Sequence, residues 1–107
     1  MIAVRFYRTA KGRLTGFMVT GHSGAGPHGE DIVCAAVSAL SVTAVNGLEK
    51  VAGIDVSPRV CDGFLYIRLP GYLSKKRKHD AKIILRTARL GLRQIANQYP
   101  RYVTIYE

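Results

Sequence analysis

The sequence has little of what marks secreted, membrane-bound or acidic proteins. It contains two cysteines, no tryptophan and only 7 acidic residues among 107. Two cysteines cannot form the disulfide framework of a small secreted domain, so we expect free thiols. No run of roughly 18 apolar residues indicates a membrane span, and the first residues alternate like a strand instead of forming the apolar block of a signal peptide. These absences favour a cytoplasmic protein with no membrane contact.

Positive charge is what the composition has in excess. Lysine and arginine number 16, which gives a net charge of +9. The charges concentrate in residues 75–79 and continue on one predicted helical face, because they recur every three or four residues at Lys82, Arg86, Arg89 and Arg93. Such a charged face is typical of a helix side exposed to solvent, and it is equally typical of a surface that binds nucleic acid or a ribonucleoprotein. Ribosome or RNA contact through this basic surface therefore stays open.

Hydrophobic periodicity predicts a single domain over residues 1–107 with the element order β-β-α-β-β-α-β. Strands are expected at residues 2–7, 14–20, 56–61, 64–69 and 102–106, and helices at residues 31–51 and 80–97. Asp62 and Gly63 form the strongest hairpin signal, and Asp80 is the expected N-cap of the second helix. Two apolar helix faces are best buried on one side of a sheet. The expected fold class is therefore α+β, with two layers, a mostly antiparallel sheet and two helices.

The segment from Gly21 to Ser38 carries residues suited to chemistry. A strand delivers His22, a glycine-rich gap of eight residues follows, and Cys34 falls in the first turn of the helix that begins after Asp31. A helix N-terminus and a neighbouring imidazolium both favour the thiolate, which is the reactive form of cysteine. Asp31 is placed to cap the helix, to orient His22, or both, and Ser38 lies one turn beyond Cys34 on the same face. A dyad of Cys34 and His22 is geometrically feasible.

The gap between His22 and Asp31 is expected to gate the site. Its glycines widen the accessible backbone conformations, so ordering the free loop costs entropy that substrate binding must supply. We predict that the loop is poorly ordered without substrate and closes over a bound peptide. The gating residues in this prediction are Ser23, Gly24, Gly26 and Gly29.

Spacing alone leaves other interpretations of these residues open. Free cysteine is among the most buried residue types and isolated histidines are usually inert, so packing alone would also account for Cys34 and His22. Cys61 has no histidine close in sequence and fits a packing or surface role. Metal binding would use His22, Cys34 and further histidines, but the sequence has no paired ligands at the spacing of structural zinc sites. It also lacks the P-loop motif of nucleotide-binding proteins. No metal and no cofactor are expected.

Motifs along nearly the whole chain form one specific combination: Gly21-His22, the glycine-rich loop, residues 29–38, and residues 98–100. This combination resembles the ribosomal-processing cysteine protease family, often called Prp. The resemblance implies a cysteine endopeptidase that removes the N-terminal extension of large-subunit ribosomal protein twenty-seven, cutting after Phe-Phe and before Ala. It also implies a homodimer, with His22 and Cys34 as the catalytic dyad and Asp31 and Ser38 in support.

Two functions of other classes are kept beside this one. The basic helix, together with Tyr66, Tyr72 and Tyr102 as stacking groups, fits a non-catalytic ribosome-associated RNA-binding module. The second is an assembly protein in which Cys34 only packs. Labelling of Cys34 by a thiol-reactive probe at neutral pH, compared with labelling of Cys61, separates an enzyme from both.

Overall fold

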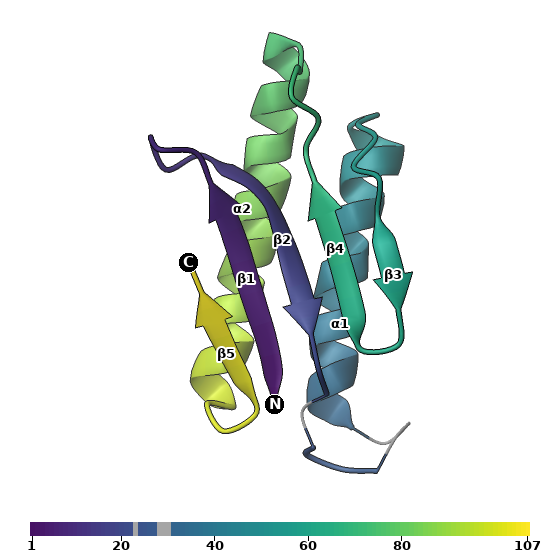
Figure 1. The fold of residues 1–107 in the computed structure, drawn as a ribbon, viewed down its shortest axis with the longest axis vertical. Helices are drawn as coiled ribbons and strands as arrows, with labels where there is room; N and C mark the ends of the chain where they lie inside the picture. The colour runs from purple at the N-terminus through teal and green to yellow at the C-terminus, as the bar shows by residue number, and fades with distance from the viewer. Residues whose placement is uncertain (23, 28–30) are drawn as a thin grey trace.

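A computed structural model describes residues 1–22, 24–27 and 31–107 of the protein. Its elements follow the predicted order along the chain (Figure 1). The strands are β1 (Ile2–Arg8), β2 (Leu14–Thr20), β3 (Arg59–Cys61), β4 (Phe64–Arg68) and β5 (Val103–Tyr106). The helices are α1 (Ile32–Asn46), which continues as a π-helical turn over Gly47–Val51, and α2 (Lys75–Gln98).

One sheet joins these strands in the order β3-β4-β2-β1-β5. Antiparallel pairing connects β1 to β2, β2 to β4 and β3 to β4, whereas β5 runs parallel to β1 at the edge. Both hairpins turn at glycines in the left-handed region, where Gly12 has φ 89° and Gly63 has φ 69°. The predicted α+β class with a mostly antiparallel sheet is confirmed.

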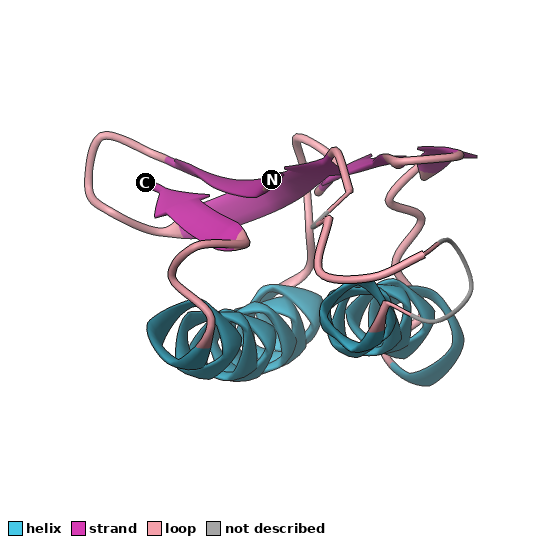
Figure 2. Cartoon of the chain, turned by 90° about the horizontal axis from the view of Figure 1, so that it is seen from below, coloured by secondary structure: helices cyan, strands magenta, loops and turns pink. Residues whose placement is uncertain are grey.

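Both helices lie side by side on the same face of the sheet (Figure 2). Along β1 every second side chain is buried, which places Ile2, Val4 and Phe6 in the core between the two layers. The helices contribute buried faces with a spacing of three or four residues: Val33, Val37, Ser41 and Ala44 from α1, and Ala81, Leu85, Ala88 and Leu92 from α2. Ser41 is the polar member of these two sets. This core holds the first turns of α1 against the sheet, where the candidate site lies.

The segment Ile32–Val51 is apolar as well as helical. It spans 20 residues with a mean hydropathy of 1.6, so length and composition alone would let it cross a membrane, which the sequence analysis did not anticipate. This is weak evidence, because the core helix of a soluble protein passes the same test. Val33, Val37 and Leu48 of the segment are each at most 1% exposed. These three apolar side chains therefore have a packing role within this fold, whereas Ile32, Val42 and Val51 of the same segment are exposed.

The start of α2 differs from the prediction. The helix begins at Lys75 and not near Asp80, because Ser74 is the N-cap and its Oγ accepts a hydrogen bond from the Arg77 N–H at 3.2 Å. Asp80 lies within the helix and pairs with Lys76 one turn earlier. The basic run has no apolar periodicity, so the sequence pattern did not reveal its helical turns.

The strand before the second hairpin is also shorter than predicted. β3 begins at Arg59 and not at residue 56, because Ser57 adopts φ 45° and donates its N–H to Asp55 Oδ1 at 2.9 Å. Ile54 and Val56 are nevertheless buried in the core. Their apolar character indicated burial correctly, but burial did not require a strand there.

Candidate active site

The main chain around His22 is fixed from two sides at the end of β2. The Met1 nitrogen donates to the His22 carbonyl oxygen, and the Gly21 N–H donates to the Gly63 carbonyl at 2.9 Å. Gly21 has φ 89°, and a Cβ at this position would lie 2.3 Å from the Met1 carbonyl oxygen. Only glycine fits so close an approach in this conformation. Glycine at position 21 therefore allows the backbone conformation that places the His22 imidazole at the cavity.

Cys34 is the third residue of α1, as the sequence predicts. Asp31 caps the helix, and its Oδ1 accepts hydrogen bonds from the Val33 N–H at 3.0 Å and the Cys34 N–H at 2.9 Å. This confirms the capping role of Asp31, which satisfies two of the backbone donors that a helix start leaves open. The cap fixes the first turn and thereby the position of the Cys34 side chain.

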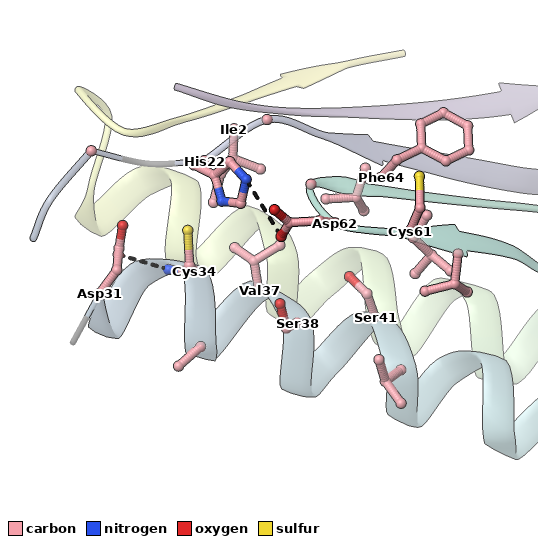
Figure 3. Close-up of a pocket in the computed structure, with 18 of the residues that line it drawn as sticks. Ile2, His22, Asp31, Cys34, Val37, Ser38, Ser41, Cys61, Asp62 and Phe64 are labelled. Carbon is pink, nitrogen blue, oxygen red and sulfur yellow. Dashed lines mark hydrogen bonds and ion pairs between the residues drawn. The ribbon is translucent and has the colours of Figure 1, made fainter. Parts of the chain in front are cut away.

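Cys34 and His22 line one cavity of about 620 Å³ between α1 and the sheet. The Cys34 side chain points from α1 toward the imidazole, which hangs from the end of β2 (Figure 3). The thiol is half-buried, and the His22 side chain is 51% exposed. Four predicted residues thus line one cavity: His22 beyond the end of β2, and Asp31, Cys34 and Ser38 at the start of α1.

The turn between β3 and β4 adds two residues that the sequence analysis treated only as a hairpin. Asp62 Oδ1 lies 3.7 Å from His22 Nε2 (Figure 3). A Cβ on Gly63 would lie 2.9 Å from the same nitrogen, so the imidazole packs directly against the glycine. The hairpin signal contained both residues, but the pairing of β2 with β4 is what brings them to His22.

Two further residues of the cavity, Ser41 and Cys61, have different surroundings. Ser41 is 1% exposed, and its Oγ lacks a hydrogen-bond partner within the described parts of the chain. Sequence reasoning missed it because it lies on the buried face of α1, where a serine gives no apolar signal. Cys61 is an exposed free thiol on β3. It lies at the surface, one of the two roles expected for it.

The predicted gating loop is described only in part. Gly24 and Gly26 line the cavity, and Gly24 has φ 74° with open space where a Cβ would be. Ser23 and Gly29 lie outside the described residues. Position 24 therefore favours glycine because of its positive φ, and not because a side chain would clash with a neighbour.

The described residues offer thiol and imidazole chemistry at this site. Within residues 1–22, 24–27 and 31–107, no three His, Cys, Asp or Glu side chains form a group that could hold a metal ion. A thiol on a capped first turn and an imidazole across a cavity are the parts that a cysteine nucleophile needs.

A sequence model described as cysteine protease Prp matches residues 1–104. The chain belongs to the Prp family. It is 28% identical over 101 residues to the ribosomal processing cysteine protease Prp of Bacillus subtilis (strain 168), a match that covers 92% of this chain and 90% of that protein. The resemblance noted from the motifs is therefore confirmed over nearly the whole length.

Solved structures of Prp proteins share the fold. The essential ribosomal processing protease Prp from S. aureus, in complex with a covalently linked product peptide, matches with a TM-score of 0.88 and 27% identity over 99% of this chain and 98% of that chain. SMU.848 from Streptococcus mutans matches with a TM-score of 0.83 and 38% identity over 99% and 92%. The Prp family is one of cysteine proteases, so the prediction of an enzyme is confirmed.

Proposed function

We propose that Cys34 is the nucleophile and His22 the general base of this cysteine protease. The observation that supports the assignment is the Cys34 side chain, held by a capped helix turn and directed at His22 across one cavity. Cys61, the second thiol, lies on the exposed edge strand β3. Among the described residues, Cys34 is the cysteine whose side chain points toward a histidine (Figure 3).

The reaction follows from the two groups. The His22 imidazole accepts the thiol proton, and the Cys34 sulfur attacks the peptide carbonyl carbon. His22 then returns the proton to the leaving amine, which breaks the C–N bond and leaves a thioester on Cys34. Water attacks the thioester while His22 accepts its proton, and the thiol leaves reprotonated. No oxidant, metal or cofactor enters this balance.

The proposed substrate is the N-terminal extension of large-subunit ribosomal protein twenty-seven. Support comes from family membership and from the apolar residues that line the cavity. Its walls include exposed or half-buried apolar residues from both layers: Val19, Val42, Val60 and Phe64. Such walls suit an extension that ends in aromatic residues before the cut, because burial of each apolar side chain favours binding by about 1.5–3 kcal/mol.

Asp31 and Ser38 are proposed as supporting residues, and the loop as the gate. Asp31 fixes the first turn of α1, and Ser38 lines the same cavity one turn further along. Gly24 and Gly26 border the cavity from the loop side, where closure over a bound peptide would exclude water.

Digestion of the extended ribosomal protein from the same organism tests the proposal. The purified enzyme is incubated with that protein, and the products are measured by intact mass. We expect one cut that releases the extension, no cut by Cys34→Ala, and continued cutting by Cys61→Ala, the matched control. Circular dichroism verifies that both variants are folded.

Two results would contradict the assignment in different ways. Cleavage by Cys34→Ala would reject the nucleophile, whereas an intact ribosomal protein together with cleavage of other Phe-Phe-Ala peptides would reject the substrate. Cytoplasmic localisation and a homodimer are proposed from the sequence and the family resemblance. Light scattering of the purified protein tests the dimer, and a mass of 11.7 kDa would exclude it.

A further inference from the structure

A second concavity, of about 740 Å³, lies at the opposite end of β2 from His22. Its walls come from the β1–β2 hairpin and from the first half of α2. We define the basic groove by its six exposed cationic residues: Lys11, Arg13, Lys75, Lys78, Lys82 and Arg86. Residues far apart in sequence thus place charge of one sign on both sides of one hollow.

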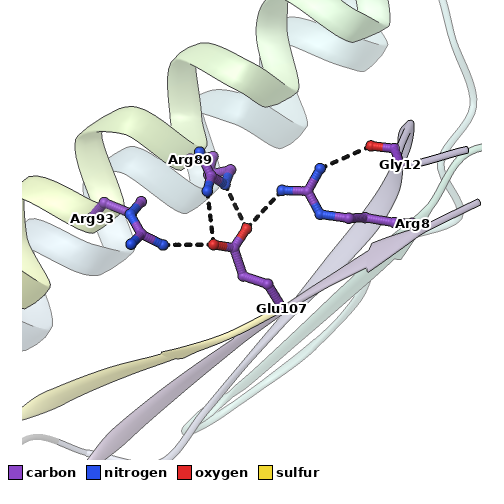
Figure 4. A network of polar contacts seen from close by, with 5 residues as sticks. All are labelled: Arg8, Gly12, Arg89, Arg93 and Glu107. Carbon is purple, nitrogen blue, oxygen red and sulfur yellow. Dashed lines mark hydrogen bonds and ion pairs between the residues drawn. The ribbon is translucent and has the colours of Figure 1, made fainter.

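The cations that line this hollow differ in whether an acidic side chain of the described residues pairs with them. Arg8 and Arg89, which also line the hollow, are bound by the Glu107 carboxylate at 2.7 and 2.5 Å (Figure 4). The six residues of the basic groove form no ion pair with any of the residues that the structure describes. The fold therefore neutralises the arginines at the inner edge and leaves the outer cations available to an external anion.

The position of the cations is unfavourable for α2 itself. Lysines 75 and 78 lie in the first turns of the helix, which contain no acidic residue at their start, and the positive end of the helix dipole repels them. Lys78, Lys82 and Arg86 follow at spacings of four, where like charges repel one another. Helix stability does not explain this arrangement, whereas a bound polyanion would remove the repulsion.

The dimensions of the groove fit a run of phosphates. Lys75 and Arg86 are eleven residues apart on a helix, or about 16 Å. A nucleic acid strand carries one phosphate per about 3.4 Å of helix axis, so about five phosphates would match this length. Leu14 is the large apolar residue of the lining and is only 6% exposed, so the groove presents no exposed apolar side chain of the kind that anchors a helix in a lipid bilayer.

We propose that the basic groove binds the phosphate backbone of ribosomal RNA while the cavity at Cys34 acts on the peptide. This inference rests on the proposed function, because a ribosomal protein substrate meets the enzyme beside RNA. β2 runs from Leu14 to Thr20, a length of about 20 Å, and His22 lies just past its far end. RNA in the groove would therefore leave the cavity open. A basic ribosomal protein is not attracted by a basic enzyme, so the RNA supplies the attraction.

Binding of a labelled 20-nucleotide RNA hairpin, measured by fluorescence anisotropy at several salt concentrations, tests the groove. The variant Lys78→Gln/Lys82→Gln/Arg86→Gln removes three groove charges. The matched control Lys50→Gln/Arg68→Gln/Arg101→Gln removes three exposed charges elsewhere. We expect the affinity of the groove variant for the hairpin to fall at least tenfold. The magnitude of the slope of log K against log salt concentration should decrease by about 2, and both quantities should change little in the control.

Other outcomes would overturn the proposal. Equal losses in both variants would show that net charge alone attracts RNA. Tighter groove-dependent binding to phosphatidylserine vesicles or to polyglutamate than to the hairpin would replace RNA by a membrane or an acidic protein. Cleavage of the free extension peptide should be the same in both variants. That assay reports on the proposed function separately, since it contains no RNA.

Discussion

Asp31 and Asp62 each place a carboxylate beside one member of the proposed dyad, and the two differ in strength of contact. Asp31 binds the first turn of α1 through two hydrogen bonds near 3 Å. Asp62 lies 3.7 Å from His22 Nε2, too far for a hydrogen bond, and its side chain is 82% exposed. An exposed pair of this kind contributes at most about 1 kcal/mol. At the residue scale, the cap therefore positions Cys34 more firmly than the ion pair positions His22.

The dyad and its supports should respond differently to substitution. His22→Ala should lower kcat/KM by about 10²- to 10⁴-fold, because it removes the general base. Asp31→Ala and Ser38→Ala should keep a measurable fraction, since loss of a cap costs roughly 1 kcal/mol and leaves both reacting groups in place. Steady-state cleavage of the extension peptide gives the comparison. Wild-type rates for His22→Ala would contradict the assignment.

Ser41 offers a test of packing in the cavity wall. Its buried Oγ lacks a partner among the described residues, and an unsatisfied hydroxyl is unfavourable in a core. Ser41→Ala should therefore raise the free energy of unfolding by about 1 kcal/mol, a value that urea denaturation can resolve. Ser38→Ala on the exposed side of α1 is the control and should change it by less than about 0.5 kcal/mol. A loss of stability in Ser41→Ala would indicate a hydrogen bond that the cavity wall needs.

Single residues were predictable where local sequence determines their role. Asp31 three residues before Cys34 is a capping pattern, so the position of the thiol followed from spacing. Asp62 and Ser41 were not predictable, because their roles arise from β2–β4 pairing and from helix packing. Tertiary contacts of this kind leave no periodic signal in the sequence.

At the element scale, the β3–β4 hairpin acts as a support for the imidazole. Gly63 and Gly12 both have positive φ, but only a Cβ at Gly63 meets a neighbour, namely His22. Gly63→Ala should therefore lower kcat more than its loss of stability explains. Gly12→Ala should show comparable backbone strain with unchanged kcat. Peptide cleavage and thermal unfolding of both variants separate the two effects, and equal kcat values would show that His22 does not depend on the hairpin.

Element boundaries followed the apolar pattern only where that pattern continued. The first hairpin and the long apolar helix were placed nearly correctly, because their buried residues recur at regular spacing. α2 extends five residues before the predicted start, over a run of charges whose helical form depends on the Ser74 cap. β3 is shortened by the left-handed residue Ser57, a conformation that serine rarely adopts and that the sequence did not signal.

At the scale of the whole molecule, Glu107, which directly follows β5, connects that strand with β1 and α2. Its carboxylate binds Arg8 of β1 and both Arg89 and Arg93 of α2 (Figure 4). The hydrogen bond from Arg89 is the main reason that the pKa of Glu107 falls from 4.5 to about 2. A carboxyl whose pKa is lowered by folding stabilises the fold above its ordinary pKa, and this contribution disappears as the pH falls through the folded value.

Glu107→Gln should therefore make the protein less stable at neutral pH. The difference in urea midpoint between wild type and variant should shrink as the pH falls from about 4.5 to about 2. Arg101→Gln, outside this network, is the control and should not reproduce the pH dependence. A constant difference across the whole range would mean that Glu107 acts through packing and not through its charge.

The parallel pairing of β1 with β5 sets the order in which the enzyme can be completed during synthesis. The start of β1 holds the His22 carbonyl through Met1, yet its edge is covered only by residues made about 100 positions later. At a synthesis rate of roughly 5–20 residues per second, that edge of β1 stays unpaired for about 5–20 s. A nascent chain thus contains both His22 and Cys34 long before the outer edge of β1 is paired. The topology therefore completes the strand that supports His22 only after β5 has been made, beside the ribosomal proteins that the enzyme is proposed to process.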